Sequence, residues 1–292
     1  MQAAQPFLLR GCAAQPALRL RRRAPPARRA SGCAASAVAP PSLAALAQHY
    51  GSEGWVAVAG VLTPDEVAAL QAASDALTAG VAALEASERR GGVYYEVQTA
   101  SGRKREPAVA PGVLRKITNP SARSPPFAAL REHPRVLRLA AALSGVAAPV
   151  CVVDQVTTKA GGGVGTGFPW HQDASFLFGD AARRLAAHGG VNCVLALDAS
   201  HARNGGFEVL GRTHAGPVLD LHGRYDASGD GGGLFDEAHR AAPTLAPGDA
   251  IFFHPRLAHG SGANTSARAR RLATLWFVGG GAPPAADAAG ED

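Results

Sequence analysis

Between residues 60 and 145, apolar positions recur mainly at the spacing of amphipathic helices. Thr63-Pro64-Asp65-Glu66 has the composition of a capped helix start: threonine as N-cap, proline at the first position and glutamate at the third. Apolar residues then recur at intervals of three and four up to Leu84, which predicts a helix from 63 to about 88. Shorter helices are expected over residues 43–50, 127–131 and 135–143.

From Pro149 onward, short apolar runs alternate with turn residues, which is typical of β-strands. A Gly-rich loop is expected over 161–167, and a long loop over the site is expected over 220–240. Helices followed by many short strands predict a mainly β fold, a double-stranded β-helix (jelly roll) with N-terminal and flanking α-helices. The expected strands are 55–61, 93–97, 113–117, 150–158, the segment ending near His171, 191–198, 206–210, 249–253 and 271–278.

Residues 1–40 differ in composition from the rest of the chain. They contain seven arginines and no acidic residue, and the first acidic residue is Glu53. Such a segment is typical of a mitochondrial or chloroplast transit peptide, so we expect an organellar protein; a disordered basic tail is the alternative. Residues 41–280 are expected to form a single domain, followed by a disordered tail over 281–292.

The net charge of +6 is misleading, because the seven N-terminal arginines account for the whole excess of basic residues. The remaining chain is nearly neutral and gives no reason to expect a nucleic-acid partner. No membrane span is expected, since no run of about eighteen uncharged apolar residues occurs. The four cysteines form no C-x-x-C pair, which argues against a zinc knuckle. We expect a monomer that acts on a small molecule.

The candidate chemistry lies in the aromatic run Trp170–Phe178, which contains His171 and Asp173. On a strand, residues two positions apart point to the same face, so this pair can bind one metal ion. A third candidate ligand, His259, lies far downstream and is followed by Arg270. Two histidines and one carboxylate form the facial triad of non-haem Fe(II) oxygenases, in which coordination positions stay open for substrates.

These candidate ligands belong to an ordered set of motifs. The set consists of Trp170–Phe176, Ala196–Asp198, Asn204-Gly205, Pro247–Asp249, His259–Ser266 and Arg270. Taken together, the motifs resemble the phytanoyl-CoA dioxygenase family of Fe(II)- and 2-oxoglutarate-dependent oxygenases. The resemblance extends from about Gly54 to Val278.

The resemblance implies an iron site formed by His171, Asp173 and His259. It also implies that 2-oxoglutarate and O2 are consumed, that succinate and CO2 are released, and that a small organic or lipid-like substrate is hydroxylated. The presence of Asp173 favours hydroxylation, because halogenating relatives lack this carboxylate.

The resemblance further implies a set of contacts to 2-oxoglutarate. A guanidinium binds a carboxylate through two parallel hydrogen bonds, so Arg270 is expected to bind the remote carboxylate, with Arg268 as the alternative. Ser261 is expected to add a hydroxyl. Lys116 and Gln155, at less closely matched positions, are expected to contribute further contacts to 2-oxoglutarate. Lys159 is near enough in sequence to substitute for Lys116.

The chain departs from the family at Gly211–His214, where relatives read Pro-Gly-Ser-His, and at Asn192 and Val194, where relatives often have an aromatic residue. These departures leave the metal ligands intact and leave the substrate open. No CoA-binding motif is present, so an acyl-CoA substrate is not assumed. The alternatives are a cupin-like Zn(II) or Mn(II) hydrolase or isomerase, and a non-catalytic metabolite-binding protein.

Overall fold

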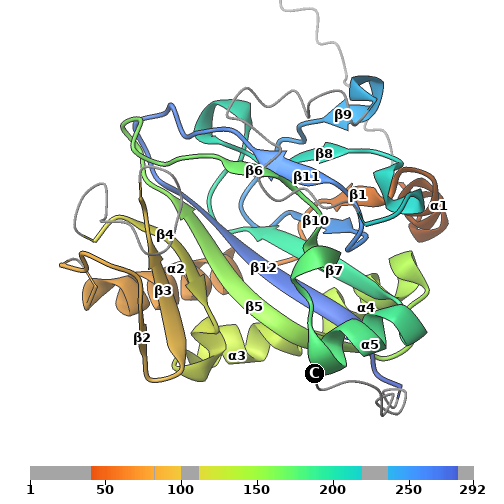
Figure 1. The fold of residues 1–292 in the computed structure, drawn as a ribbon, viewed down its shortest axis with the longest axis horizontal. Coiled ribbons are helices and arrows are strands. Elements are labelled where there is room, and N and C mark those ends of the chain that lie inside the picture. Colours follow the sequence, from red (N-terminus) through yellow and green to blue (C-terminus); the bar gives the residue numbers. More distant parts are fainter. Residues whose placement is uncertain (1–40, 82, 100–111, 219–235, 282–292) are drawn as a thin grey trace, which may run out of the picture. The chain divides into compact units, whose positions relative to one another are not determined.

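The computed structural model of the protein describes residues 41–81, 83–99, 112–218 and 236–281 (Figure 1). The N-terminal segment 1–40, residues 282–292 of the expected C-terminal tail and residues 220–235 of the expected long loop lie outside these ranges. Among the described helices, none combines the length and apolar character required to cross a bilayer.

The described elements are mainly β-strands, with α-helices packed around them. The α-helices are α1 (Leu43–Glu53), α2 (Pro64–Ala79), α3 (Pro125–Arg131), α4 (Pro134–Ser144) and α5 (Gly179–His188). The strands are β1 (Trp55–Val58), β2 (Glu88–Arg90), β3 (Val93–Val97), β4 (Leu114–Thr118), β5 (Pro149–Lys159), β6 (Phe168–His171), β7 (Gly190–Ala196), β8 (Glu208–Leu210), β9 (Arg240–Ala241), β10 (Ala250–Phe253), β11 (His259–Ser261) and β12 (Arg270–Gly279).

The strands form two antiparallel sheets that lie over one another (Figure 1). The large sheet has eight strands in the order β1-β10-β7-β12-β5-β4-β3-β2, and the small sheet has four in the order β6-β11-β8-β9. Every neighbouring pair is antiparallel, and many neighbours are far apart in sequence. The predicted mainly β, jelly-roll architecture with flanking helices is confirmed.

The main core lies between the large sheet and the helices that cover its outer face. Apolar residues of α2, α3 and α4 pack there against alternate residues of the strands. Strand β12 shows the alternation clearly: Ala273, Leu275 and Phe277 enter this core, whereas Thr274 and Trp276 face the small sheet and line a cavity. The two faces of the large sheet therefore serve different purposes, stability on one side and a binding cavity on the other.

The helix predicted over 63–88 begins as expected but is shorter. Thr63 and Glu66 form the reciprocal capping box, and the helix ends at Ala79. Val81 and Leu84 are buried, but in two successive turns rather than in a helix. Their helical spacing was misleading because a turn can bury the same positions, and residues Glu88–Arg90 belong to strand β2.

Helix α5 was not predicted. Its N-cap residue is Phe178, which makes no side-chain capping hydrogen bond, and its first residue is Gly179. No start signal marks the helix in the sequence, and its apolar stripe is short: only Ala181, Ala182 and Leu185 pack against β12 and its neighbours, and none of them is fully buried.

Candidate metal centre and its cavity

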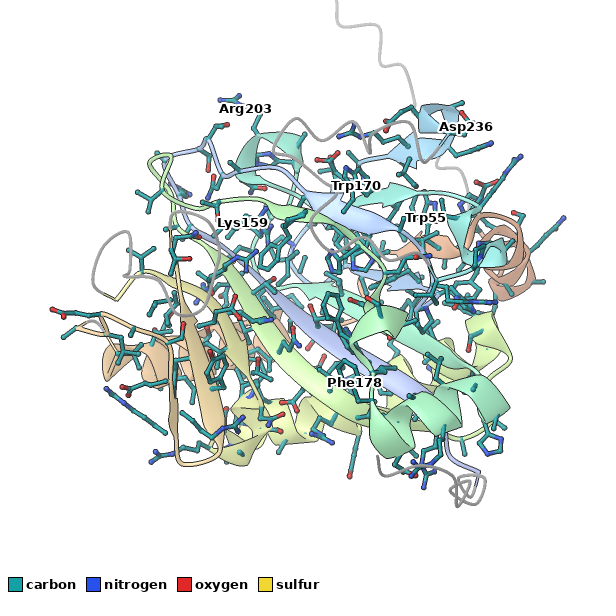
Figure 2. All side chains as sticks on the ribbon, in the orientation of Figure 1. Trp55, Lys159, Trp170, Phe178, Arg203 and Asp236 are labelled. Carbon is teal, nitrogen blue, oxygen red and sulfur yellow. The ribbon has the colours of Figure 1, made fainter. Side chains whose placement is uncertain are left out.

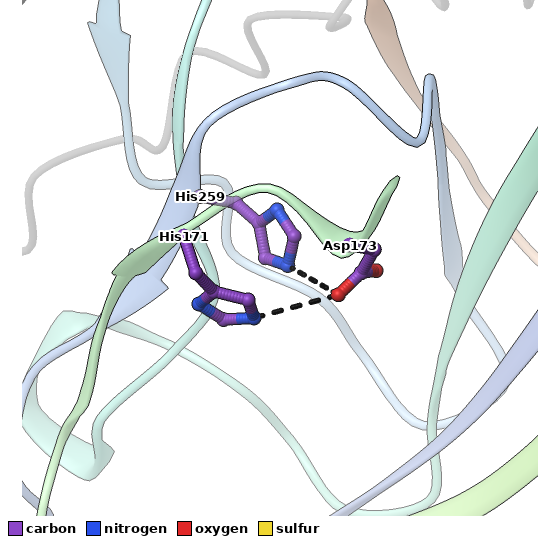
Figure 3. Close-up of side chains that lie close together, drawn as sticks. All are labelled: His171, Asp173 and His259. Atoms are coloured by element: carbon purple, nitrogen blue, oxygen red, sulfur yellow. Dashed lines mark ion pairs between the residues drawn. The ribbon is translucent and has the colours of Figure 1, made fainter. Parts of the chain in front are cut away.

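His171, Asp173 and His259 converge at one point between the two sheets (Figure 3). His171 ends β6 and His259 begins β11, and the two residues are direct cross-strand partners. One potential ligand atom from each residue lies within 4.8 Å of the others. The Nε2 atoms of both histidines lie 3.4 Å from the Asp173 Oδ1 atom. Two residues that are close in sequence and a third that lies 86 positions further on thus present three donor atoms to a single ion.

Asp173 reaches this point by a turn, so the expectation that it shares a strand face with His171 is wrong. Strand β6 ends at His171, and Asp173 begins the 3-10 helix η2 (Asp173–Phe176). The backbone N–H of Ala174 donates to the Pro255 carbonyl at 2.9 Å, which ties this turn to the segment that leads to His259. His171 and Asp173 do meet at one point, but a turn, and not a shared strand face, brings the Asp173 carboxylate there.

The hydrogen bonds of the two imidazoles orient them for metal binding. His171 Nδ1 lies 2.7 Å from the Pro169 carbonyl and His259 Nδ1 lies 2.9 Å from the Leu257 carbonyl. A ring nitrogen beside a carbonyl carries the proton, which leaves the Nε2 lone pairs directed at the shared point. Burial, and then the neighbouring His259, lower the pKa of His171 and favour its neutral form. Burial opposes ionisation of Asp173, but the two imidazoles hold its pKa below the ordinary value.

Asn192 on β7 holds the other oxygen of the candidate carboxylate ligand. Its Nδ2 donates to Asp173 Oδ2 at 2.6 Å, and both side chains are buried. The Asn192 Oδ1 atom is buried and has no partner among the described residues. With Oδ2 held in this way, Asp173 presents only Oδ1 to the ion. Sequence reasoning identified Asn192 as a departure from relatives but not as a partner of the carboxylate.

The site opens on a cavity of about 790 Å³ between the large and small sheets. Arg270 lines one end of the cavity, and Lys159, its cross-strand partner, lies beside it; each is 1% exposed. Arg270 donates to the Gly205 carbonyl, and its Nε has no partner among the described residues. Lys159 donates to Ser261 Oγ at 2.7 Å and to the Gly262 carbonyl. No carboxylate among the described residues pairs with either cation.

Burying two cations without an anion is costly, and the pKa values reflect this cost. Burial lowers the pKa of Lys159 to about 6, with smaller contributions from Arg270 and Arg115, while Glu208 acts in the opposite direction. Burial lowers the pKa of Arg270 to about 10. A buried guanidinium and a buried amine that both lack a carboxylate are well suited to bind an anionic ligand.

The other residues considered for contacts to 2-oxoglutarate do not all lie at the Arg270 end of the cavity. Gln155 lines the cavity floor on β5. Lys116 also lines the cavity, but its amino group lies 3.4 Å from Glu96. Arg268, the alternative to Arg270, is exposed and precedes β12, so it does not share a strand face with Arg270 as its spacing of two residues would suggest. Lys159, considered in the sequence only as a substitute for Lys116, lies beside Ser261 instead.

Several motif residues that are not candidate ligands have structural roles. Gly205 has φ +70°, and a Cβ atom there would lie 2.8 Å from the Lys159 Nζ atom. Asp249 accepts hydrogen bonds from the backbone of Gly60 and Ala246, which joins two turns. Asp198 pairs with the Arg271 guanidinium. The motif set therefore combines ligands with residues that fix the loops around them.

The sequence profile of the phytanoyl-CoA dioxygenase (PhyH) family matches residues 50–272. The chain belongs to the phytanoyl-CoA dioxygenase family. No curated protein sequence matches it significantly.

Solved structures with the same fold include three enzymes. The epimerase SnoN, in complex with Fe3+, alpha ketoglutarate and nogalamycin RO, has a TM-score of 0.59 and 23% identity, over 81% of this chain and 83% of that one. The carbocyclase SnoK from nogalamycin biosynthesis has a TM-score of 0.58 and 18% identity, over 80% of this chain and 83% of that one. EctD from S. alaskensis, with 2-oxoglutarate and 5-hydroxyectoine, has a TM-score of 0.59 and 24% identity, over 80% of this chain and 74% of that one. At these identities the likeness shows the fold.

Proposed function

We propose that the protein is an Fe(II)- and 2-oxoglutarate-dependent oxygenase that hydroxylates a small organic molecule. The observation that carries this proposal is that one cavity is lined by a two-histidine, one-carboxylate group and by the buried Arg270, which has another buried cation, Lys159, beside it. The first is the donor set of non-haem iron oxygenases. The second is a site for the remote carboxylate of a dicarboxylic co-substrate.

Each residue has a defined task in this proposal. His171, Asp173 and His259 would hold the iron, and Asn192 would keep the Asp173 carboxylate bound through one oxygen. Arg270 would bind the remote carboxylate of 2-oxoglutarate, with Ser261 and Lys159 beside it. When bound, the iron would supply the activation of O2 that couples conversion of 2-oxoglutarate into succinate and CO2 to oxidation of a C–H bond.

The structural neighbours support the co-substrates more strongly than the reaction. SnoN was crystallised with Fe3+ and alpha ketoglutarate, and EctD with 2-oxoglutarate and a hydroxylated compound. SnoN and SnoK, however, are an epimerase and a carbocyclase. We favour hydroxylation because Asp173 occupies the position that a halogenating relative leaves free for halide. Transfer of oxygen to the substrate is therefore the outcome to be tested.

A metal-dependent hydrolase or isomerase is the second candidate, since the same three ligands suit Zn(II). Hydrolysis has no use for a pair of buried cations at the far end of the cavity, and this favours the oxygenase. The deciding experiment adds Fe(II) and then 2-oxoglutarate to the protein without oxygen and records the visible spectrum. A charge-transfer band that appears only with 2-oxoglutarate supports the oxygenase, and the absence of a band rejects it.

We further propose that the protein acts in an organelle, on the basis of the arginine-rich segment 1–40. Fusion of these residues to a fluorescent reporter tests the proposal directly. Import into mitochondria or chloroplasts is expected, and a reporter that stays in the cytosol would refute it.

A further inference from the structure

A row of side chains crosses the floor of the cavity at right angles to the strands. The row follows the cross-strand pairing, so its members point to the same face of the sheet. From the metal site outward the residues are Val194 (β7), Thr274 (β12), Gln155 (β5), Thr118 (β4), Tyr94 (β3) and Arg89 (β2). All six line the same cavity. The two buried cations lie in a different direction, further along β5 and β12, so the row leads away from them.

The row becomes steadily more accessible with distance from the metal site. Val194 and Thr274 are buried, Gln155 and Thr118 are half-buried, and Arg89 is exposed. The side chains of Thr118, Gln155 and Thr274 form no hydrogen bond with any described residue, although each has polar atoms facing the cavity. The row from Val194 to Arg89 thus forms the floor of a trough that runs from a buried centre to solvent. Its polar groups without a protein partner are available to a ligand that lies in this trough.

The outer part of the cavity also has an excess of positive charge. Apart from Asp173 and Arg270, the charged residues that line it are three cations and one acid. Arg115 and Lys116 both lie beside that acid, Glu96, at 2.8 and 3.4 Å. Arg89 donates one hydrogen bond to the Gly92 carbonyl and pairs with no carboxylate among the described residues. The guanidinium at the end of the row therefore has no charge partner within the described fold.

Aromatic residues cover the trough near its deep end. Phe176 and Phe178, from the segment between β6 and α5, line the cavity although they are 42% and 77% exposed. Figure 2 shows Phe178 near the end of the sheet opposite Lys159. Exposed phenylalanines beside a cavity gain stability when an apolar ligand surface covers them. A ligand in the trough would thus meet hydrogen-bonding groups on one side and aromatic rings on the other.

We propose that the substrate is an elongated organic anion whose negative group binds Arg89 while the carbon to be oxidised lies at the metal site. The proposal rests on the proposed function for the identity of the reacting end. Four interstrand spacings of about 4.8 Å separate Thr274 from Arg89, so the two ends of the substrate lie roughly 19 Å apart. Between them the molecule carries polar groups that bind Gln155 and Thr118, and an apolar face toward Phe176 and Phe178.

The experiment uses two fluorescent probes that share the same ring systems: anilinonaphthalene sulfonate, an anion, and phenylnaphthylamine, which lacks the sulfonate. Their affinities are measured for the full-length protein with saturating 2-oxoglutarate. The wild-type protein is expected to bind the sulfonate about tenfold more tightly, as one charge-assisted hydrogen bond allows. Arg89→Gln should remove this preference and leave the affinity for phenylnaphthylamine unchanged.

Arg90→Gln is the matched control, because Arg90 is also exposed on β2 but points to the other face, where it lies beside Glu88. Equal affinities of wild type for the two probes, or equal effects of the two substitutions, would overturn the proposal. So would tighter binding of the sulfonate when 2-oxoglutarate is left out, which would show that it binds at Arg270. Probe binding requires neither iron nor turnover, so failure of the oxygenase proposal would appear separately, as absence of the charge-transfer band.

Discussion

The two ends of the cavity are built on different principles. At the closed end, Asp173, Asn192, Lys159 and Arg270 are buried, and each makes a hydrogen bond that fixes its position within the fold. At the open end, Arg89 is exposed, and the side chains of Thr118 and Gln155 form no hydrogen bond with any described residue. A reactive centre requires fixed geometry, whereas recognition of a particular substrate requires groups that are free to bind it. The closed end is thus suited to the shared chemistry and the open end to selection.

The largest effect is expected from Asp173→Ala, which removes a candidate ligand at the closed end. We expect 2-oxoglutarate-dependent succinate release to become undetectable and Fe(II) binding to fall at least about tenfold, since two imidazoles remain. Asp180→Ala is the control, because Asp180 is an exposed carboxylate that pairs with Arg184 on α5. Succinate release by the Asp173 variant at the wild-type rate would contradict the assignment of the centre.

Replacing the buried guanidinium should act on 2-oxoglutarate rather than on iron. Arg270→Gln is expected to weaken 2-oxoglutarate binding about a hundredfold, the order of loss when one partner of a buried charge pair is removed. Titration of the anaerobic Fe(II) form with 2-oxoglutarate, followed by its visible band, measures this. Arg268→Gln provides the comparison and should leave the affinity unchanged, because Arg268 is exposed outside the cavity. The reverse result would move the anchor to Arg268.

Asn192→Ala tests whether the hydrogen bond behind the carboxylate contributes to the closed end. Loss of a group that orients a metal ligand typically lowers metal affinity by about tenfold or somewhat more, and we expect a loss in this range. Competition with a chromophoric chelator for Fe(II) measures the affinity without turnover. Cys193→Ala serves as the control, because the adjacent Cys193 packs in the core on the opposite face of the sheet. An equal loss in both variants would indicate general destabilisation instead.

The smallest effect concerns pH. The pKa of Lys159 is about 6 in the free protein, where burial, Arg270 and Arg115 disfavour its charge and only Glu208 favours it. A bound carboxylate favours the protonated amine, so the pKa rises on binding and the complex takes up a proton. The affinity for 2-oxoglutarate should therefore be greatest below pH 6 and fall, by at most about tenfold per unit, as the pH rises above it. Calorimetry in two buffers measures the proton uptake, which Lys159→Met should abolish.

The sequence predicted the parts of the fold and site that depend on local spacing. The start of α2 was predicted because Thr63 and Glu66 cap it within a single turn. The triad was recognised because ligand type and order along the chain are visible without a structure. Asn192 and Lys159 were not assigned to their partners, because Asp173 and Ser261 lie 19 and 102 positions away from them and no spacing rule links such residues.

Local patterns also misled where tertiary packing determined the outcome. Asp173 has the spacing of a strand neighbour of His171, yet a turn held by the Pro255 carbonyl carries it. The apolar residues Val81 and Leu84 continued the helical period beyond the end of α2, because burial selects apolar residues in turns as well as in helices. The direction in which side chains face the cavity became clear only from the register between strands.

The alternation of core-facing and cavity-facing residues along β12 limits how this protein can change over evolutionary time. Its odd-numbered positions Ala273, Leu275 and Phe277 stabilise the core, and the even-numbered positions between them form part of the cavity floor. Insertion or deletion of a single residue within the strand would exchange the two sets and place polar side chains in the core. New specificities on this floor therefore have to arise by substitution at constant strand length, whereas the connecting loops tolerate insertions.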